Sequence, residues 1–298
     1  MVKKVFSFLF ALLIAVLGGC DFSHKDSLRI SANLWIGYTP LFYIKERGWL
    51  KEHNIELVNV VSLHENMQLY AVGNVDLFTG TQYEYHRMKE TYPDLYPLIL
   101  LDRSVGGDVV MSNRSIEDLK QSVKKIDAYL EVDSVNSELL RAFLKKSGIN
   151  ISKLCVHNLD PESISKLQMR ESPVLIVTYA PYDTALKQKG YQIVTDSKAL
   201  ASQFQIFDAI YGDKTLLKKY GEEIRVLNRL LAKALKDLRR DPKRYYTYVR
   251  HYLQQERYEA FLDALDRIEW IYADRSQQLL GQLQRQNLPV NHLREPVK

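Results

Sequence analysis

The sequence predicts an α/β protein of two lobes, each built from a parallel-type sheet flanked by helices. Short apolar runs of strand length alternate with helix-like segments from residue 28 to about 101, and the same alternation resumes from 126 to 195. A polar passage with two glycines, residues 104–108, separates the two series. With 298 residues, 46% of them hydrophobic, the chain is long enough to bury a core in each lobe.

The N-terminus predicts an export signal that does not belong to the lobes. Lys3 and Lys4 precede an apolar run, 5–17, that is short for a membrane span, and Gly18-Gly19-Cys20 follows. This pattern favours a secretory signal peptide over residues 1–19, with an uncleaved membrane anchor as the alternative. In both cases the lobes are expected outside the cytoplasm.

Cys20 is the expected site of lipidation. Leu17-Gly18-Gly19-Cys20 resembles the bacterial lipobox, in which the cysteine is lipidated and becomes the first residue of the mature protein. Asp21 resembles the signal that keeps many such lipoproteins on the inner membrane. We therefore expect a lipidated tether over residues 20–27 that holds the lobes at the periplasmic face of the inner membrane.

Residues 28–81 are expected to organise the first lobe. An apolar run from 28 to 35 predicts a strand, and Thr39-Pro40 predicts the start of a helix that ends at Gly48. The expected elements that follow are strands at 55–61 and 75–78 and a helix at 64–72. Parallel strands joined by helices place all their strand-to-helix loops at one edge of the sheet, where ligands bind. We therefore expect a binding site that starts at Trp35.

The rest of the chain predicts a second lobe inserted into the first. After a helix at 83–91 and a strand at 98–101, the passage 104–108 crosses to the second lobe. The elements expected there are strands at 109–111, 126–132, 154–159, 174–178 and 191–195 and helices from 115, at 134–147, 161–170 and 181–189. A strand at 205–211 is expected to return to the first lobe, and everything beyond Asp213 is helical by periodicity. The first lobe thus comprises 28–104 and 205–298, and the second comprises 105–204.

Composition argues against nucleic-acid partners, disulfides and enzymatic chemistry. The formal charge of +5 includes Lys3 and Lys4, so that 5 − 2 = +3 remains after export, which is too mild to favour nucleic acid. With Cys20 assigned to lipid, Cys155 has no partner for a disulfide. The sequence has no glycine-rich phosphate loop, His-Glu-x-x-His, Cys-x-x-Cys or Gly-x-Ser-x-Gly. We expect no catalytic residue, no cofactor and no metal site.

A series of short motifs resembles one family over about residues 28–245. The motifs are Trp-x-Gly-Tyr-x-Pro-Leu at 35–41, Gly48-Trp49, Gly73-Asn74-Val75-Asp76, Ser104-Val105-Gly106-Gly107-Asp108, Thr178-Tyr179-Ala180-Pro181-Tyr182 and Thr195-Asp196-Ser197. In order and spacing they resemble the periplasmic substrate-binding proteins of ABC transporters for nitrate, alkanesulfonates, taurine and thiamine-pyrimidine precursors. The resemblance implies a two-lobed periplasmic-binding-protein fold of type II, with a two-stranded hinge, that closes around a small ligand and docks on a membrane permease.

The sequence departs from this family at two places that bear on the ligand. Members often have an acidic residue near 170–174 and another at the position of Ala180. Here Glu171-Ser172-Pro173 and an alanine stand there. The resemblance therefore leaves the ligand class open.

Candidate ligand contacts come from loops at the ends of strands. Backbone N–H groups at helix starts suit an anionic group, and aromatic rings suit a flat or cationic group. The candidate residues are Asn33, Trp35, Tyr38, Gly80, Thr81, Gln82, Ser104, Asp108, Ser134, Asn136, Tyr179 and Tyr182. For Ser134 a plain helix cap is equally compatible with the sequence. Asp108 and Asp208 suit either an amine ligand or a hydrogen bond at a hinge or strand end, and Arg103 suits either an anion or a hinge salt bridge.

These features together predict a solute-binding lipoprotein of an ABC importer. The expected ligand is a small nitrogen- or sulfur-containing organic molecule or an anion, and the expected partner is a membrane permease. The alternative is a sensory lipoprotein that uses the same cleft and presents it to a membrane signalling receptor. We expect a monomer held at the membrane by the lipid on Cys20.

Overall fold

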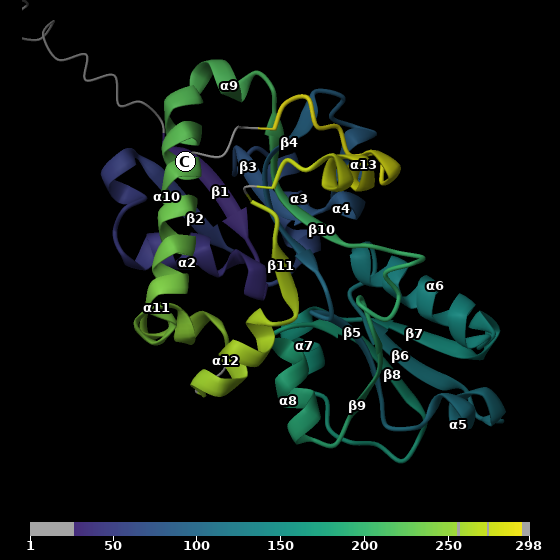
Figure 1. Ribbon diagram of the computed structural model, residues 1–298. Helices are drawn as coiled ribbons and strands as arrows, with labels where there is room; N and C mark the ends of the chain where they lie inside the picture. The colour runs from purple at the N-terminus through teal and green to yellow at the C-terminus, as the bar shows by residue number, and fades with distance from the viewer. Residues whose placement is uncertain (1–26, 255–256, 273, 294–298) are drawn as a thin grey trace, which may run out of the picture.

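The structure consists of two β-sheets, each covered by helices on both faces, which Figure 1 shows as an upper and a lower lobe. It is a computed structural model that describes residues 27–254, 257–272 and 274–293. The predicted signal peptide over 1–19, the lipidation site Cys20 and the tether up to residue 26 lie outside the described residues. Within the described ranges, no helix has both the length and the apolar character needed to cross a membrane.

The first lobe is built on a six-stranded sheet with the order β11-β4-β10-β3-β1-β2. Its strands are β1 (Leu28–Ala32), β2 (Ile55–Asn59), β3 (Leu77–Thr81), β4 (Leu95–Ser104), β10 (Phe207–Asp213) and β11 (Ile268–Trp270). β1 pairs in parallel with β2 and β3, whereas β10 runs antiparallel to both β3 and β4. The strand predicted at 205–211 therefore does return to the first sheet.

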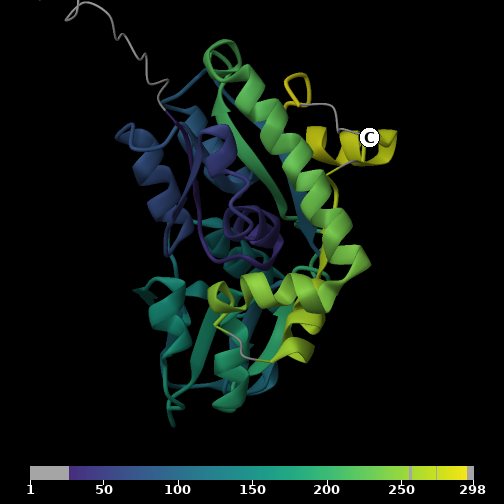
Figure 2. The same cartoon turned by 90° about the vertical axis from the view of Figure 1, so that its left-hand side faces the viewer.

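Helices cover both faces of the first sheet. They are α2 (Thr39–Glu46), α3 (Leu63–Ala71), α4 (Gln82–Lys89), α9 (Leu216–Lys219), α10 (Gly221–Arg240), α11 (Pro242–Val249), α12 (Tyr258–Leu265) and α13 (Gln277–Arg285), with short 3-10 turns η1 (Ile36–Tyr38), η2 (Lys51–His53) and η4 (Arg250–Tyr252). One core lies under α2, α10 and α11, and the other lies under α3, α4 and α13. The apolar stripe of α10, from Ile224 to Leu238, is buried as its periodicity predicts. Figure 2 shows α10 descending along the first lobe to α11 and α12.

The second lobe is built on a five-stranded sheet with the order β7-β6-β8-β5-β9. Its elements are β5 (Asp108–Ser112), α5 (Ile116–Gln121), β6 (Ile126–Leu130), α6 (Val135–Ser147), η3 (Ile151–Lys153), β7 (Leu154–Asn158), α7 (Pro161–Ser165), β8 (Val174–Tyr179), α8 (Tyr182–Gln188) and β9 (Gln192–Asp196). α5 and α6 cover one face, and α7 and α8 cover the other. Ser115 and Asp118 form a capping box at the start of α5, where the sequence predicts a helix, and Gly148, at φ +73°, ends α6.

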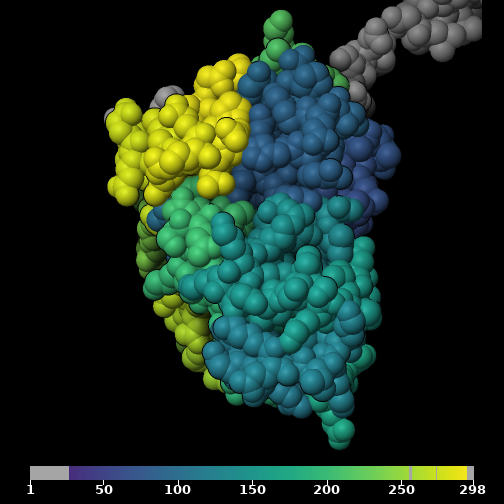
Figure 3. All heavy atoms as spheres, turned by 90° about the vertical axis from the view of Figure 1, so that its right-hand side faces the viewer, coloured from purple at the N-terminus to yellow at the C-terminus, as the bar shows by residue number. Residues whose placement is uncertain are grey.

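Two chain segments connect the lobes, as a two-stranded hinge requires. The first is 105–107, between β4 and β5, and the second is 197–206, between β9 and β10. Ser104 and Ser197 join them through their hydroxyl oxygens at 2.7 Å, and the Gly106 N–H donates to the Ser197 hydroxyl at 2.8 Å. Figure 3 shows the two lobes in contact on the face it presents. The predicted fold class, two α/β lobes with a hinge, is confirmed.

Three predictions about the elements need correction. Both sheets are mixed rather than parallel, because the strands on either side of the hinge, β4 and β10 in one sheet and β5 and β9 in the other, run antiparallel to their neighbours. The segment beyond Asp213 is not helical throughout, because β11 adds an edge strand to the first sheet. Three residues are too few for periodicity to separate a strand from a helix end. The helix predicted at 161–170 is also shorter and ends at Ser165.

Candidate functional site

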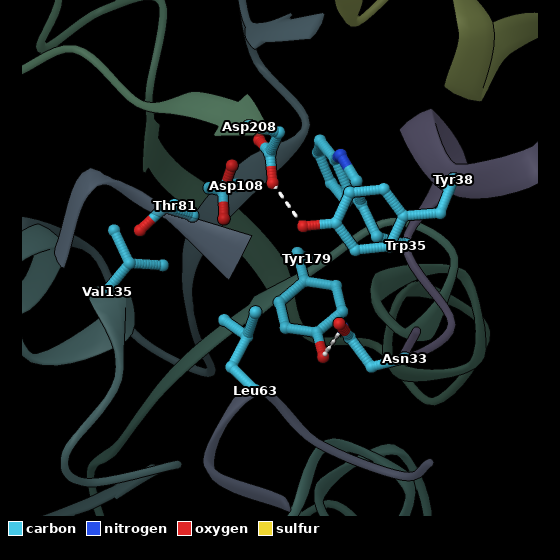
Figure 4. Close-up of a pocket in the computed structure, with 9 residues that line it drawn as sticks. All are labelled: Asn33, Trp35, Tyr38, Leu63, Thr81, Asp108, Val135, Tyr179 and Asp208. Atoms are coloured by element: carbon cyan, nitrogen blue, oxygen red, sulfur yellow. Dashed lines mark hydrogen bonds between the residues drawn. The ribbon is translucent and has the colours of Figure 1, made fainter. Parts of the chain in front are cut away.

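A small central cavity lies between the two lobes (Figure 4). Its lining residues from the first lobe are Asn33, Trp35, Tyr38, Leu63, Thr81 and Asp208, and those from the second lobe are Asp108, Val135 and Tyr179. Most of these follow the ends of strands, which is where the sheet topology predicts a ligand. The cavity volume is about 10 Å³, which is room for about one water-sized group. A larger ligand therefore needs the lobes to part or the lining side chains to move.

Aromatic rings form one wall of the central cavity. The rings of Trp35 and Tyr179 meet edge to face with centroids 5.8 Å apart, and Tyr179 meets Tyr182 in the same way at 5.5 Å. A Cβ on Gly107 would lie 2.3 Å from the Trp35 ring, so the indole packs directly on the hinge backbone. Only glycine at 107 allows this contact, and Trp35 thereby links the cavity wall to the hinge.

A chain of side-chain hydrogen bonds crosses from one lobe to the other beside this wall. The Asn33 amide donates to the Tyr179 hydroxyl at 2.9 Å, as Figure 4 shows. Asn66 in turn donates to the Asn33 amide oxygen at 3.0 Å and to the Thr79 hydroxyl at 3.3 Å. All four residues are at most 2% exposed, so these bonds satisfy groups that would otherwise be costly to bury.

Three aspartates lie in or beside the cavity, since Asp108 and Asp208 line it and Asp102 lies behind the Trp35 indole. The Tyr38 hydroxyl donates to Asp208 at 2.6 Å, and the Trp35 indole N–H donates to Asp102 at 3.0 Å. Asp108 is the first residue of β5. Its Oδ2 atom has no hydrogen-bond partner in the described part of the chain. The three side chains are at most 4% exposed, and no described lysine, arginine or histidine forms an ion pair with any of them. The cavity is therefore rich in negative charge or in bound protons.

Burial raises the pKa of each of these carboxyl groups. The pKa of Asp102 rises to about 8 and that of Asp108 to about 7, in both cases chiefly because the charged form loses water. Burial, and then repulsion from Asp102, raises the pKa of Asp208 well above its ordinary value. Carboxyl groups so close together cannot all ionise without a compensating positive charge.

The sequence suggested that backbone N–H groups at helix starts bind an anionic ligand. In the structure, carboxylate side chains of the protein already accept hydrogen bonds from such groups. Glu84 of α4 accepts from the Val135 N–H, the first residue of α6 in the other lobe, at 2.9 Å. Its second oxygen accepts from the Thr81 N–H at 2.8 Å. In the opposite direction, Glu131 of the second lobe accepts from the His64 N–H at the start of α3, at 2.7 Å. Carboxylates at helix N-termini are favourable, so these contacts both tie the lobes together and fill the expected anion positions.

The structure brings six of the twelve predicted contact residues to the central cavity. These are Asn33, Trp35, Tyr38, Thr81, Asp108 and Tyr179. The other six lie nearby without lining it. Gln82 holds the start of β10 by bonding Gln205 and Phe207, Ser104 belongs to the hinge, and Ser134 is the N-cap of α6. Gly80 lies within β3, while Asn136 and Tyr182 are buried at the starts of α6 and α8.

Sequence reasoning missed or understated three residues at this site. Leu63, the first residue of α3, lines the cavity and was not considered, whereas Val135, the first residue of α6, lines it and was expected with Ser134 and Asn136 among the helix-start contacts. Asp208 lines it as well, although the sequence favoured a plain strand-end hydrogen bond there. Asp102 was not considered, and the only sequence signal for it is a charged residue inside an apolar strand. Arg103, the next residue, pairs with Glu269 of β11 rather than facing the cavity.

A second cavity, called the outer cavity below, also has lining residues from both lobes. Its volume is about 190 Å³, and its lining residues are Ser62, His64, Glu131, Val132, Asp133, Asn158 and Asp160. Ser62 and His64 flank Leu63 of the central cavity in the sequence. The lining includes three acidic residues and no lysine or arginine.

One group of side chains in the described ranges has the donor atoms for a metal ion. Asp127, Cys155 and His157 place their donor atoms within 4.8 Å of one another on β6 and β7, which form an edge of the second sheet. His157 lies 2.9 Å from the Asp127 carboxylate and Arg170 lies 3.9 Å from it, so protein groups already neutralise that carboxylate. None of the three lines the central cavity.

Comparison with solved structures identifies the fold. The aliphatic sulphonate binding protein SsuA from Escherichia coli superposes with a TM-score of 0.67 at 16% identity, covering 88% of this chain and 91% of that one. The ligand-binding component of an ABC-type import system from Staphylococcus aureus, solved with zinc bound, gives 0.67 at 13% identity, covering 91% and 97%. The periplasmic nitrate-binding protein NrtA from Synechocystis gives 0.62 at 12% identity, covering 80% and 70%.

At these identities the likeness concerns the fold alone. No protein-family model matches the sequence, and no curated protein matches it either. The neighbours share the two-lobed α/β architecture over most of their length. The chain therefore has the fold of the periplasmic binding proteins.

Proposed function

We propose that the chain is the extracytoplasmic solute-binding lipoprotein of an ABC importer, which captures a small molecule between its lobes and delivers it to a membrane permease. The observation that carries this proposal is the central cavity, because both lobes contribute side chains to it and the hinge lies beside it. A site split between two hinged lobes closes around a ligand and excludes water from it.

The fold neighbours support the same function. The sulphonate- and nitrate-binding proteins are described by the solutes that they bind, and the Staphylococcus aureus protein is described as the ligand-binding component of an import system. We extend solute binding to this chain on the basis of its own cavity, and extend the permease partner by analogy with these proteins. The proposal is one of reversible binding and involves no catalysis.

The proposed location follows from the N-terminal sequence. Signal cleavage after residue 19 and lipidation of Cys20 would anchor the lobes to the periplasmic face of the inner membrane. The segment from residue 20 to 27 would act as the tether. Labelling of cells with a fatty-acid probe tests this, since the wild-type protein should carry the label and Cys20→Ala should not.

A screen for ligand-induced stabilisation tests solute binding. The melting temperature of the purified protein is measured with sulfonates, amines, amidines, pyrimidines and nitrate. A ligand that binds only the folded protein raises the melting temperature, and the stabilisation grows with the logarithm of its concentration once this exceeds Kd. We expect at least one class to do so. If none does, and native mass spectrometry detects no small molecule retained from the cell, the proposal is wrong.

A further inference from the structure

The charge of the central cavity identifies the class of ligand, provided that this cavity is the solute site proposed above. Asp108 and Asp208 line it, and Asp102 lies behind the Trp35 indole, to which it is hydrogen bonded. The carboxylate of Glu84 also acts on Asp108 and Asp208. Four acidic side chains thus converge from β4, β5, β10 and α4.

The described residues supply almost no positive charge to balance these acids. Among the described residues, Arg267, just before β11, is the one cation that acts on Asp108, and burial, Ser104 and Glu84 all affect the pKa of that carboxyl group more strongly. Arg267 already donates to both oxygens of Asp183, at 2.7 and 3.0 Å. Tyr38, Tyr179 and Tyr211, which also neighbour these acids, are neutral phenols whose pKa burial raises well above the ordinary value.

One acceptor atom is built into the cavity and left open. The Asp108 side chain is 4% exposed, lines the cavity, and has no hydrogen-bond partner for Oδ2 among the described residues. A buried carboxylate oxygen without a partner is costly, and a ligand N–H donor would remove that cost. One carboxylate oxygen of Asp208 already accepts a hydrogen bond from the Tyr38 hydroxyl.

The positions that would suit an anion are already filled. Glu84 caps the start of α6 and Glu131 caps the start of α3, so the N–H groups aimed between the lobes are engaged by carboxylates of the chain. An anionic ligand would have to displace them and then lie among like charges. The acidic outer cavity would in addition attract cations and repel anions.

We propose that the ligand is a small organic cation with N–H donors, a primary ammonium or an amidinium, whose charged group binds between Asp108 and Asp208. The rings of Trp35, Tyr38 and Tyr179 also line the cavity. Their π faces attract a cation, and they offer apolar contact to the hydrocarbon part of the ligand. The volume of the cavity fits one ammonium-sized group without rearrangement. The remainder of the ligand would extend toward the outer cavity as the lobes adjust.

Binding of this kind releases a proton. As the cation enters, a carboxyl group of the cluster ionises, its O–H proton passes to water or buffer, and the ligand N–H takes over the hydrogen bonding. The described titratable groups of the cluster are Asp102, Asp108, Asp208, Glu84, Tyr38, Tyr179, Tyr211 and Arg267, and Arg267 is the only cation among them. The raised pKa of Asp108, about 7, places this exchange near neutral pH.

Calorimetric titration of the full-length protein in detergent tests the proposal. The probes are ethylammonium and acetamidinium, tetramethylammonium as a cation without N–H donors, and ethanesulfonate and nitrate as anions. We expect binding of ethylammonium or acetamidinium, weaker binding of tetramethylammonium and none of the anions. The heat should vary with the ionisation enthalpy of the buffer, and the affinity should rise about fivefold from pH 6 to pH 7, because a carboxyl group with a pKa of about 7 is roughly one-tenth ionised at pH 6 and half ionised at pH 7.

Two variants and a control locate the site. Asp108→Asn and Asp208→Asn keep the shape of the side chain and should each weaken cation binding roughly tenfold or more, as loss of a charge-assisted hydrogen bond does. Asp263→Asn, on the exposed face of α12, should leave binding unchanged. Proton release by the wild-type protein provides a readout even if a variant fails to fold.

The possible failures separate the ligand class from solute binding itself. If ethanesulfonate or nitrate binds and no cation does, or if both aspartate variants bind the cation as tightly as wild type, the cation assignment is wrong while solute binding stands. If no probe binds, the cation assignment is overturned. If native mass spectrometry then also detects no retained small molecule, the solute-binding function fails as well.

Discussion

The side-chain amide of Asn33 donates a hydrogen bond of 2.9 Å to the hydroxyl of Tyr179, and this bond joins the end of β1 in one lobe to the end of β8 in the other. The two residues are 146 positions apart in the sequence and both are buried. Because the bond lies on the wall of the central cavity, contact between the lobes and the shape of the site depend on the same atoms.

Removal of the Tyr179 hydroxyl should weaken the contact between the lobes. Tyr179→Phe leaves the Asn33 amide without this acceptor, and a buried donor left unpaired costs about 1–3 kcal/mol. Tyr182→Phe is the matched control, because its hydroxyl is equally buried and has no partner in the described part of the chain. Urea unfolding measures both. Equal losses of stability would show that the bond contributes nothing specific.

A methyl group at residue 107 should disturb the cavity wall. The Cβ of Gly107→Ala would lie 2.3 Å from the Trp35 ring, which forces the indole or the hinge to move, and overpacking of this kind costs about 1–3 kcal/mol. Gly221→Ala is the control, since a Cβ there meets open space at the start of α10 and should be neutral or stabilising. Melting temperature and ligand affinity are the measurements. An alanine at 107 that matches wild type in both would contradict the packing of Trp35 on the hinge.

Without added ligand, the protein should lose stability as the pH rises through neutrality. The pKa is raised to about 8 for Asp102 and to about 7 for Asp108 and Glu131. A carboxyl group whose folded pKa lies above its unfolded value of about 4 stabilises the fold fully below that value, and the contribution is lost as the pH rises through the folded pKa. The melting temperature should therefore fall between pH 5 and pH 8.5.

The variant Asp108→Asn should flatten this pH profile, because the amide does not ionise. Ionisation of Asp183 changes stability in the opposite direction, because Arg267 beside it keeps the pKa of this carboxyl group below its ordinary value. That change occurs below pH 4, outside the measured range. A melting temperature that rises from pH 5 to pH 8.5 in the wild type would contradict the assignment of raised pKa values.

The ion pair between Arg267 and Asp183 should be important for stability. Asp183 is fully buried and accepts both hydrogen bonds from Arg267, which connects the segment before β11 to α8 of the second lobe. Asp183→Asn leaves the largely buried arginine without its counter-charge, and loss of one partner of a buried pair costs about 3–5 kcal/mol. Chemical denaturation measures the loss.

An exposed ion pair in the same lobe serves as the comparison. Glu162 and Lys166 of the α7 region pair at 2.6 Å, with the Lys166 side chain 70% and the Glu162 side chain 42% exposed. Glu162→Gln should leave the unfolding midpoint unchanged, because exposed pairs contribute little. An equal effect of the two substitutions would mean that burial does not determine the importance of the Arg267 pair.

Much of the fold could be predicted because its signals are local. Alternating apolar runs and helix caps such as Ser115 and Gly148 specify strands and helices within a few residues. Trp35, Asp108 and Tyr179 could be predicted as site residues for the same reason, since each follows or begins a strand and parallel strands end at one edge. The antiparallel strands that make both sheets mixed could not be predicted, because their pairing involves strands far apart in the sequence on either side of the hinge.

The electrostatics of the site could not be predicted from local pattern. Thr81 and Glu84 have the spacing of a capping box within one helix, and the structure contains that box. The second oxygen of Glu84 reaches Val135 in the other lobe, and no sequence spacing encodes a contact over 51 residues. The cluster of Asp102, Asp108 and Asp208 likewise arises only when β4, β5 and β10 meet at the hinge.

The most direct test of the central claim is a crystal structure of the protein with a solute that the binding screen identifies. The account predicts one solute molecule between the lobes, with a polar group within hydrogen-bond distance of Asp108 and its body against the rings of Trp35 and Tyr179. A solute bound on the outside of either lobe, with the central cavity unchanged, would contradict it.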